Sequence, residues 1–331
     1  MFTKEQKMRR KPLDYFFVTL KGMAMGAADV VPGVSGGTIA FISGIYEELI
    51  SAINSIKLSS LKIWKTAGFK AMWNSFNGNF LLALVTGIAI SIFSLARLIT
   101  WLLETHPIAV WSFFFGLVVA SIYIIGRQIS SWSAGVITAV LAGAALSYYI
   151  TIAHPVSSPD SYPYLFLSGF IAIIAMILPG ISGAFILLLM GSYSIVMNTI
   201  NLLREGIFQG DLQVAGQAFS KMAVFGIGAV MGLKVFSGIL NWMFKHHKNT
   251  TLALLTGFMI GSLNKIWPWK ETLSWRINSH NEQVPLLQKS ISPFHFEGDN
   301  QVFLAVFVAI AGFLTIYLLE RIAVKAQKAD E

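Results

Sequence analysis

The chain has 331 residues, of which 55% are hydrophobic and only 12% are charged, and its mean hydropathy is +0.66. A soluble domain carries about 25% charged residues, so these figures exclude an ordinary soluble protein and predict an all-α integral membrane protein. The net charge of +8 would suggest nucleic-acid binding in a soluble chain. In a membrane protein the cations first mark orientation, so we expect no nucleic-acid partner.

The chain begins with a basic stretch, Lys4 to Lys11, before an apolar run from Tyr15. This resembles a signal peptide, but Lys21 interrupts the apolar run after a few residues, so we expect a retained cytoplasmic segment. A full helical span needs about 20 apolar residues. Ten apolar segments follow, at 15–29, 37–54, 80–104, 107–126, 132–153, 162–178, 183–202, 220–244, 250–266 and 302–320.

Two breaks rich in proline and glycine interrupt this pattern, and they repeat each other. The string Val31–Gly37, VPGVSGG, matches Leu178–Ala184, LPGISGA. Further matched pairs keep their order along the chain: Gly44 and Gly191, Tyr46 and Tyr193, Trp101 and Trp242, Gly116 and Gly257. Such collinearity predicts an internal duplication, with a first membrane repeat at 1–154 and a second at 155–331.

Each repeat is predicted to hold one re-entrant broken hairpin and three full spans. Residues 15–54 as one helix would run about 60 Å against a hydrocarbon core of about 30 Å, and Pro32 favours a break. The hairpins at 15–54 and 162–202 then enter and leave on one side. Three crossings remain per half, and this odd number inverts the second repeat. A polar insertion at 267–301 is predicted on the outer side.

The distribution of basic residues supports this topology. The segments placed in the cytoplasm hold 15 of the 24 Lys and Arg residues, whereas the segments placed outside hold six. This asymmetry follows the positive-inside rule. We therefore expect a multi-pass protein of the bacterial cytoplasmic membrane with both termini in the cytoplasm.

Three cations remain within apolar segments, namely Lys21, Arg97 and Lys234. A charge near the bilayer centre costs at least about 2.5–3.5 kcal/mol and usually faces a cavity or a partner. Lys234 aligns with Phe93, four residues before Arg97, so both cations occupy nearly the same helical face in the two halves. We predict that they converge on one central anion site. The alternative is that each snorkels to an interface or pairs with a carboxylate.

Acidic residues offer candidates for tuning such a site or coupling it to a proton. Asp29 is the clearest buried acid, and it could pair with Lys21 or Arg97, titrate as a proton site, or form a purely structural ion pair. Glu47 and Glu48 lie near the end of the returning arm, where solvation at the interface is the simpler explanation. We keep Asp29, Lys21 and Glu47 as candidate coupling or site-tuning residues.

The two breaks add complementary chemistry, because Gly36-Gly37-Thr38 and Gly183-Ala184 begin helices whose first amides have no internal partner. Helix N-termini of this kind attract anions, and discontinuous helices that meet at the midplane are a recurring transporter design. Ser35 and Ser182 could cap these helices or contact a ligand. The alternative is close helix packing by small residues.

An enzyme must also be considered, since Gly33-Val34-Ser35-Gly36 resembles the GxSG string of intramembrane serine proteases. A serine nucleophile needs an adjacent base, but all six histidines fall at span ends or in loops. The string also recurs around Ser182, and a symmetric pair suits a binding site better than a single nucleophile. We predict no catalytic residue, no cofactor and no metal.

The string Gly26–Thr38, followed by Gly44-Ile45-Tyr46-Glu47, resembles the bacterial polyprenyl-phosphate transporter family called PopT, and the motif Leu178–Gly183 and the length fit as well. The resemblance implies that the protein returns undecaprenyl phosphate, the lipid carrier of cell-wall synthesis, to the cytoplasmic leaflet. The phosphate would then be held by eight residues: Arg97, Lys234, Ser35, Gly36, Gly37, Thr38, Ser182 and Gly183. A carrier or channel for a soluble anion is the alternative, and an intramembrane hydrolase is the weaker one. The coupling ion and the oligomeric state are not predicted.

Overall fold

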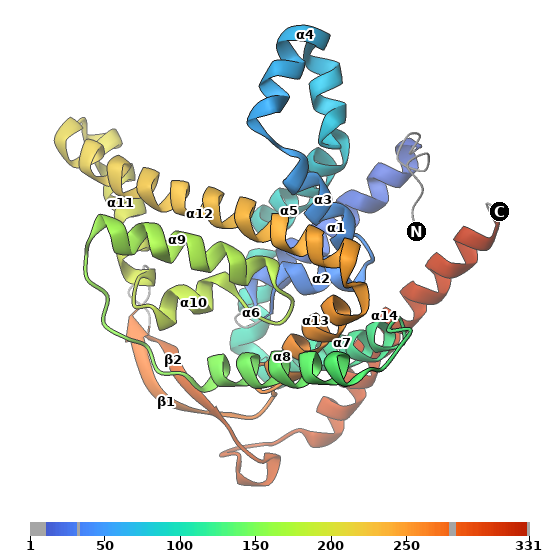
Figure 1. The fold of residues 1–331 in the computed structure, drawn as a ribbon. Coiled ribbons are helices and arrows are strands. Elements are labelled where there is room, and N and C mark those ends of the chain that lie inside the picture. The colour runs from blue at the N-terminus through green and yellow to red at the C-terminus, as the bar shows by residue number, and fades with distance from the viewer. Residues whose placement is uncertain (1–10, 32–33, 278–282, 330–331) are drawn as a thin grey trace.

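The computed structural model describes residues 11–31, 34–277 and 283–329 (Figure 1). The basic residues at 4–10 and the predicted break residue Pro32 lie outside the described residues. Within them the chain forms fourteen α-helices and one β-hairpin. The helices are α1 (Pro12–Val30), α2 (Gly36–Ile42), α3 (Tyr46–Ser55), α4 (Leu58–Ser75), α5 (Gly78–Ser94), α6 (Ala96–Thr105), α7 (Pro107–Gly126), α8 (Ala134–Ile152), α9 (Tyr162–Ile177), α10 (Gly183–Leu189), α11 (Tyr193–Gln209), α12 (Leu212–His246), α13 (Lys248–Ser262) and α14 (Val302–Ala329).

Several of these helices are long and apolar enough to cross a membrane, as expected of a multi-pass membrane protein. By length and composition, each of α7, α8 and α12 could cross a membrane alone. Two bent pairs of helices could each cross as one span, namely Lys62–Ser75 with α5 and α10 with α11. The apolar parts of α9 and α14 are shorter. The predicted all-helical membrane architecture is thus confirmed in its main part.

Local sequence signals explain where these helices begin. Pro107 opens α7, where its missing N–H costs nothing. The Ser133 hydroxyl accepts a hydrogen bond from the Val136 amide at the start of α8. The Asp211 carboxylate accepts from two amides in the first turn of α12, at 3.0 and 3.1 Å. Each side chain satisfies donors that the helix itself leaves unpaired.

The helices end and begin again on either side of both proline-glycine motifs, as the sequence predicts: α1 ends at Val30 and α2 begins at Gly36, and α9 ends at Ile177 and α10 begins at Gly183. Each returning arm is broken a second time, however, so the single arms predicted at 37–54 and 183–202 are each two helices. Gly44 and Gly191 stand at these second breaks with φ values of 73° and 68°. A β-carbon disfavours this left-handed conformation, so glycine at both positions ends the short helix and turns the chain.

The packing of the two halves follows the sequence repeat. Helix α1 packs along α5, and α9 packs along α12; α8 packs along α13, and α14 along α7. Glycines let the paired helices approach closely, and glycines at matched positions make matching contacts with the neighbouring helix. Gly116 of α7 lies against the backbone of Ala309 in α14, and Gly257 of α13 lies against the backbone of Val140 in α8, so a β-carbon at either position would overlap its neighbour.

Two predicted spans differ from the observed helices. The span at 80–104 is interrupted at Leu95, between α5 and α6. The Ser94 hydroxyl donates to the Ile90 carbonyl at 2.6 Å, a contact of the kind that often bends helices. The span at 250–266 ends as a helix at Ser262, because Leu263 to Ile266 form a turn.

The prediction of an all-α fold is wrong for the polar insertion at 267–301. Strands β1 (Lys270–Ile277) and β2 (Gln283–Ser290) form an antiparallel pair in which Lys270 lies opposite Ser290. The sequence of β1 alternates apolar and polar side chains, a period-two pattern that is typical of a strand. In Figure 1 the hairpin lies at the lower left, whereas the end of α14 lies at the right and α4 projects at the top.

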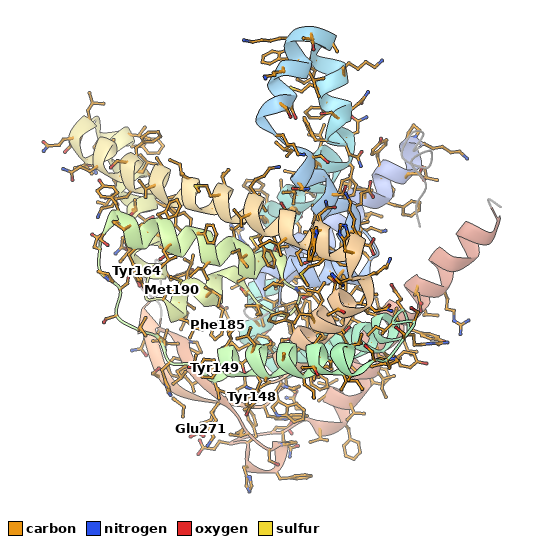
Figure 2. The ribbon with its side chains drawn as sticks, viewed as in Figure 1. Tyr148, Tyr149, Tyr164, Phe185, Met190 and Glu271 are labelled. Carbon is orange, nitrogen blue, oxygen red and sulfur yellow. The ribbon has the colours of Figure 1, made fainter. Side chains whose placement is uncertain are left out.

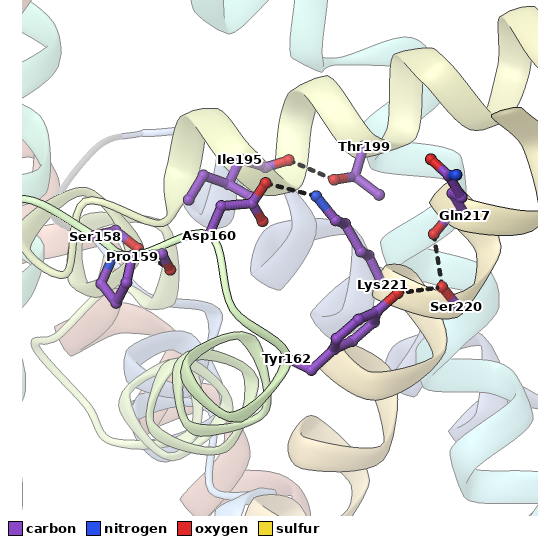
Figure 3. A network of polar contacts seen from close by, with 9 residues as sticks. All are labelled: Ser158, Pro159, Asp160, Tyr162, Ile195, Thr199, Gln217, Ser220 and Lys221. Atoms are coloured by element: carbon purple, nitrogen blue, oxygen red, sulfur yellow. Dashed lines mark hydrogen bonds and ion pairs between the residues drawn. The ribbon is translucent and has the colours of Figure 1, made fainter.

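A polar network fixes the loop before α9 to α12 (Figure 3). The Lys221 amine forms an ion pair with Asp160 at 2.6 Å, and the Tyr162 and Ser220 hydroxyls are 2.8 Å apart. These contacts lie in the N-terminal third of α12, thirteen residues before Lys234. They anchor the second hairpin where it begins.

Candidate functional site

The two broken hairpins contact each other directly at their breaks. The Ser35 hydroxyl donates to the Met176 carbonyl at 2.8 Å, and the Thr38 hydroxyl accepts from the Gly180 amide at 2.8 Å. The Tyr46 hydroxyl donates to the Ile177 carbonyl at 3.2 Å. Because Ser35, Thr38 and Tyr46 are almost fully buried, these bonds join the two motifs in the interior.

Apolar side chains from both breaks surround these bonds and belong to one core. They are Val31, Val34, Ala40 and Ile45 from the first break and Ile177, Leu178 and Ile181 from the second. Gly37 packs so closely on the Ile177 carbonyl that a β-carbon there would overlap it. Polar backbone groups of the two breaks are therefore held against each other in a dry environment.

The N-terminus of α2 already holds an anion of the chain itself. The Asp29 carboxylate accepts from the Gly36 amide at 2.6 Å, and the Ser35 hydroxyl accepts from the Gly37 amide at 3.0 Å. The sequence predicted this helix start as an anion site and considered a cation as the partner of Asp29. The structure places the Asp29 carboxylate on the helix start instead.

The N-terminus of α10 differs although its sequence motif is similar. Ser182 stands at the N-cap without a side-chain bond to the helix, and the residue that matches Asp29 in the repeat is Met176. Gly183 is buried and packs against the Ala172 carbonyl. The second break therefore has the same backbone shape without a carboxylate.

Lys234 lies half-buried on α12 and contacts the end of the first hairpin. Its amine donates to the carbonyls of Ile53 and Asn54 at 3.0 and 2.7 Å. These belong to the last turn of α3, where carbonyls lack partners within the helix and the dipole favours a cation. An ammonium group has three donors, so one remains for a ligand.

Lys21 contacts the other broken end in the first hairpin. Its amine donates to the Ser43 carbonyl at 2.8 Å, just past the end of α2. In the second hairpin the Tyr164 hydroxyl donates to the matching carbonyl, that of Met190, at 2.8 Å (Figure 2). A neutral hydroxyl thus does in the second half what a cation does in the first.

Arg97 lies exposed on α6, and within the described residues its guanidinium makes no hydrogen bond or ion pair. Helix α6 packs against α1, α5 and α7, whereas α12 packs against α3, α9, α11 and α13. The structure therefore does not bring Arg97 and Lys234 into contact in this conformation.

The remaining candidate, Glu47, lies at the surface. Its carboxylate forms an ion pair with the Lys248 amine at 2.8 Å, and both side chains are about half exposed, at 50% and 54%. Glu48 accepts from the Asn77 side chain at 2.7 Å. These contacts fit a solvated end of the helices.

Sequence reasoning missed two groups at the crossing of the breaks. Tyr46 is buried between Phe41 and Phe244, at ring distances of 5.0 and 6.0 Å. Its recurrence as Tyr193 in the repeat was a usable signal. The carbonyls of Met176 and Ile177 belong to apolar residues, so no side-chain pattern could have identified them.

Comparisons with known proteins agree with the resemblance seen in the motifs. A family model described as undecaprenyl phosphate translocase-like matches residues 25–284. A Vibrio cholerae serotype O1 protein named polyprenyl-phosphate transporter is 48% identical over 322 residues, which cover 96% of this chain and 100% of that protein. A Staphylococcus aureus protein of the same name is 34% identical over 264 residues, or 75% of this chain and 85% of that protein. No solved structure matches with significance.

Proposed function

Because this chain belongs to the undecaprenyl phosphate translocase-like family, we propose that it moves undecaprenyl phosphate across the bacterial cytoplasmic membrane. The lipid carrier would return to the cytoplasmic leaflet, where cell-envelope synthesis uses it again. The phosphate head cannot cross hydrocarbon unaided, whereas the polyprenyl tail can remain in lipid. The protein therefore needs to supply a polar path for the head alone.

The observation that carries this proposal is the meeting of two broken helices at buried polar contacts. Ser35, Thr38 and Gly180 form hydrogen bonds between the two breaks. The half-buried amine of Lys234 bonds the end of the first hairpin. Backbone polar groups at membrane depth are tolerated only where protein buries them or where they line a cavity. Such unwound segments are typical of substrate sites in transporters.

In the proposed site Lys234 binds the phosphate through its remaining N–H, and Arg97 swings inward from α6 to join it when the protein changes conformation. Ser35 to Thr38 and Ser182 with Gly183 supply further donors. Charge-assisted bonds of this kind are about twice as strong as neutral ones. The protein would thus hold the head group by donors from both halves.

Asp29 has a defined role in this proposal. Its carboxylate occupies the Gly36 amide and would repel a phosphate at the same place. Protonation of Asp29 removes the charge and weakens its bond to Gly36, which frees the α2 N-terminus. A proton taken up at Asp29 would thereby accompany phosphate entry.

The proposed topology is an inverted repeat with re-entrant hairpins at 15–54 and 162–202. Equivalent helix pairs and equivalent glycines in the two halves support it. The start of α1 and the end of α14 lie on the same side in Figure 1, which agrees with both termini in the cytoplasm. The two halves would rock about the crossing of the breaks and expose the site alternately.

Transport in reconstituted vesicles tests the function and the site together. Wild-type protein should move undecaprenyl phosphate between leaflets, whereas undecaprenol should show no dependence on the protein. Arg97→Ala and Lys234→Ala should each lower the rate at least tenfold while remaining folded, because each removes a charge-assisted donor. Lys62→Ala and Lys245→Ala, which change exposed lysines of α4 and α12, should transport normally. Full transport by both test variants would end the central-site proposal.

A further inference from the structure

A second group of lysines lies beside the second break, between the helices and the β-hairpin. Lys265 lies between the end of α13 and the start of β1, and Lys270 is the first residue of β1. Neither takes part in the site proposed above. The insertion that carries Lys270 folds back onto the ends of α7 and α14, where Trp269 packs with Ile108 and Ala305.

The Lys270 amine is buried and lacks a hydrogen-bond partner within the described residues. It lies 3.1 Å from the centroid of the Trp111 ring on α7. The ring face attracts one side of the ammonium group but accepts no ordinary hydrogen bond. In its charged form the amine has three N–H donors, and it bonds no oxygen of the described residues.

Lys265 adds a second cation to the same region. Its amine lies 4.0 Å from the centroid of the Phe185 ring on α10. Within the described residues neither lysine forms an ion pair. Glu271 follows Lys270, but its side chain is exposed at the surface (Figure 2), and successive strand residues face opposite sides. Burial lowers the pKa of Lys270 well below its usual value, and the nearby charge of Lys265 lowers it further.

A cavity of about 510 Å³ lies beside the segment that carries these lysines; neighbours of both line it, although neither lysine does. Its lining includes Phe115, one helical turn beyond Trp111, and Asn264, which precedes Lys265. Ser290 and Ser292 from the end of the hairpin line it as well. The volume falls within the range of small-molecule sites, and the lining is partly polar.

Two buried lysines without an acid are unfavourable in their charged form unless something compensates them. An anion that reached both amines would favour the charged form of each, opposite the rings of Phe185 and Trp111. A lysine retained only for packing would not need a second lysine nearby, since like charges repel.

We infer that Lys265 and Lys270, with the adjoining cavity, form a binding site for a phosphate group at the outer face of the protein. Given the proposed function and topology, on which this inference rests, the ligand is the head group of a polyprenyl phosphate in the outer leaflet. The site captures the lipid before its head enters the crossing of the breaks. Free phosphate shares the same chemistry and is the other source to be separated by experiment.

Equilibrium binding to the full-length protein in nanodiscs of neutral lipid tests this site. The probes are undecaprenyl phosphate, undecaprenol and inorganic phosphate. Lys265→Met and Lys270→Met keep a long unbranched side chain and remove its charge. Each should weaken binding of undecaprenyl phosphate at least tenfold. The matched control Lys289→Met changes an exposed lysine on the same hairpin and should bind as wild type.

The outcomes separate this site from the function. Wild-type transport with unchanged binding in Lys265→Met and Lys270→Met overturns the site alone, whereas a wild-type protein that neither binds nor transports the lipid overturns the function and the site together. Lysine-dependent binding of inorganic phosphate without binding of the lipid overturns the lipid as ligand. Thermal unfolding and size-exclusion chromatography establish folding, and Lys265→Met carries the test if Lys270→Met does not fold.

Discussion

The two broken hairpins share a backbone design but differ in charge. Both break at a proline-glycine motif, and both turn again at a glycine with positive φ. In the first hairpin the Asp29 carboxylate bonds the start of α2, and the Lys21 amine bonds the backbone at the second break. The second has Met176 in place of Asp29 and ends the matching helix with the hydroxyl of Tyr164.

The shared backbone geometry and the unshared charge therefore have different explanations. The two breaks share their backbone geometry, and each is buried against the other. Charge is expensive in a membrane, and only the first hairpin carries it. Of the two hairpins, only the first therefore brings charged side chains to the proposed site, and the second contributes neutral donors.

A substitution at one pair of matched positions would test the shared geometry, and it has the largest expected effect on stability. Gly37→Ala places a β-carbon against the Ile177 carbonyl, and such overpacking costs about 1–3 kcal/mol. The repeat already has alanine at the matching position, and Ala184→Gly should cost only about 0.5–1 kcal/mol. In detergent the melting temperature of Gly37→Ala should be lower than that of Ala184→Gly. The reverse order would contradict the close contact at Gly37.

A smaller effect is expected from the hydrogen bond that Tyr46 makes across the breaks. Tyr46→Phe removes the donor to the Ile177 carbonyl, and such a loss costs about 0.5–1.5 kcal/mol. The control is Tyr162→Phe, which removes a hydroxyl from the exposed contact with Ser220. A melting temperature of Tyr46→Phe no lower than that of the control would show that the bond does not hold the two hairpins together.

Much of the fold could be predicted from the sequence because apolar length and repetition are strong signals. The motifs around Pro32 and Pro179 predict both breaks, and the sequence match of Gly116 with Gly257 agrees with their equivalent packing. Composition alone identified the membrane. The family resemblance rested on one long motif, and the comparisons agree with it.

Other features depend on tertiary contacts and could not be predicted in this way. The second break of each arm follows from the φ of Gly44 and Gly191, which apolar pattern does not reveal. The partner of Asp29 is a backbone amide, and those of Lys234 are backbone carbonyls, so charged residues of opposite sign do not indicate them. The β-hairpin lies in the segment predicted as a polar insertion, and the alternation of side chains in β1 is the local signal that indicates a strand there.

The role of Asp29 is the central claim, and the pH dependence of transport tests it most directly. Asp29→Asn keeps an acceptor for the Gly36 amide and removes the charge. Wild-type transport of undecaprenyl phosphate in vesicles should rise as pH falls, because protonation of Asp29 frees the α2 N-terminus. The lipid phosphate itself titrates near pH 6, but it does so equally for both proteins. We expect a flatter profile for Asp29→Asn than for wild type, and identical profiles would contradict the account.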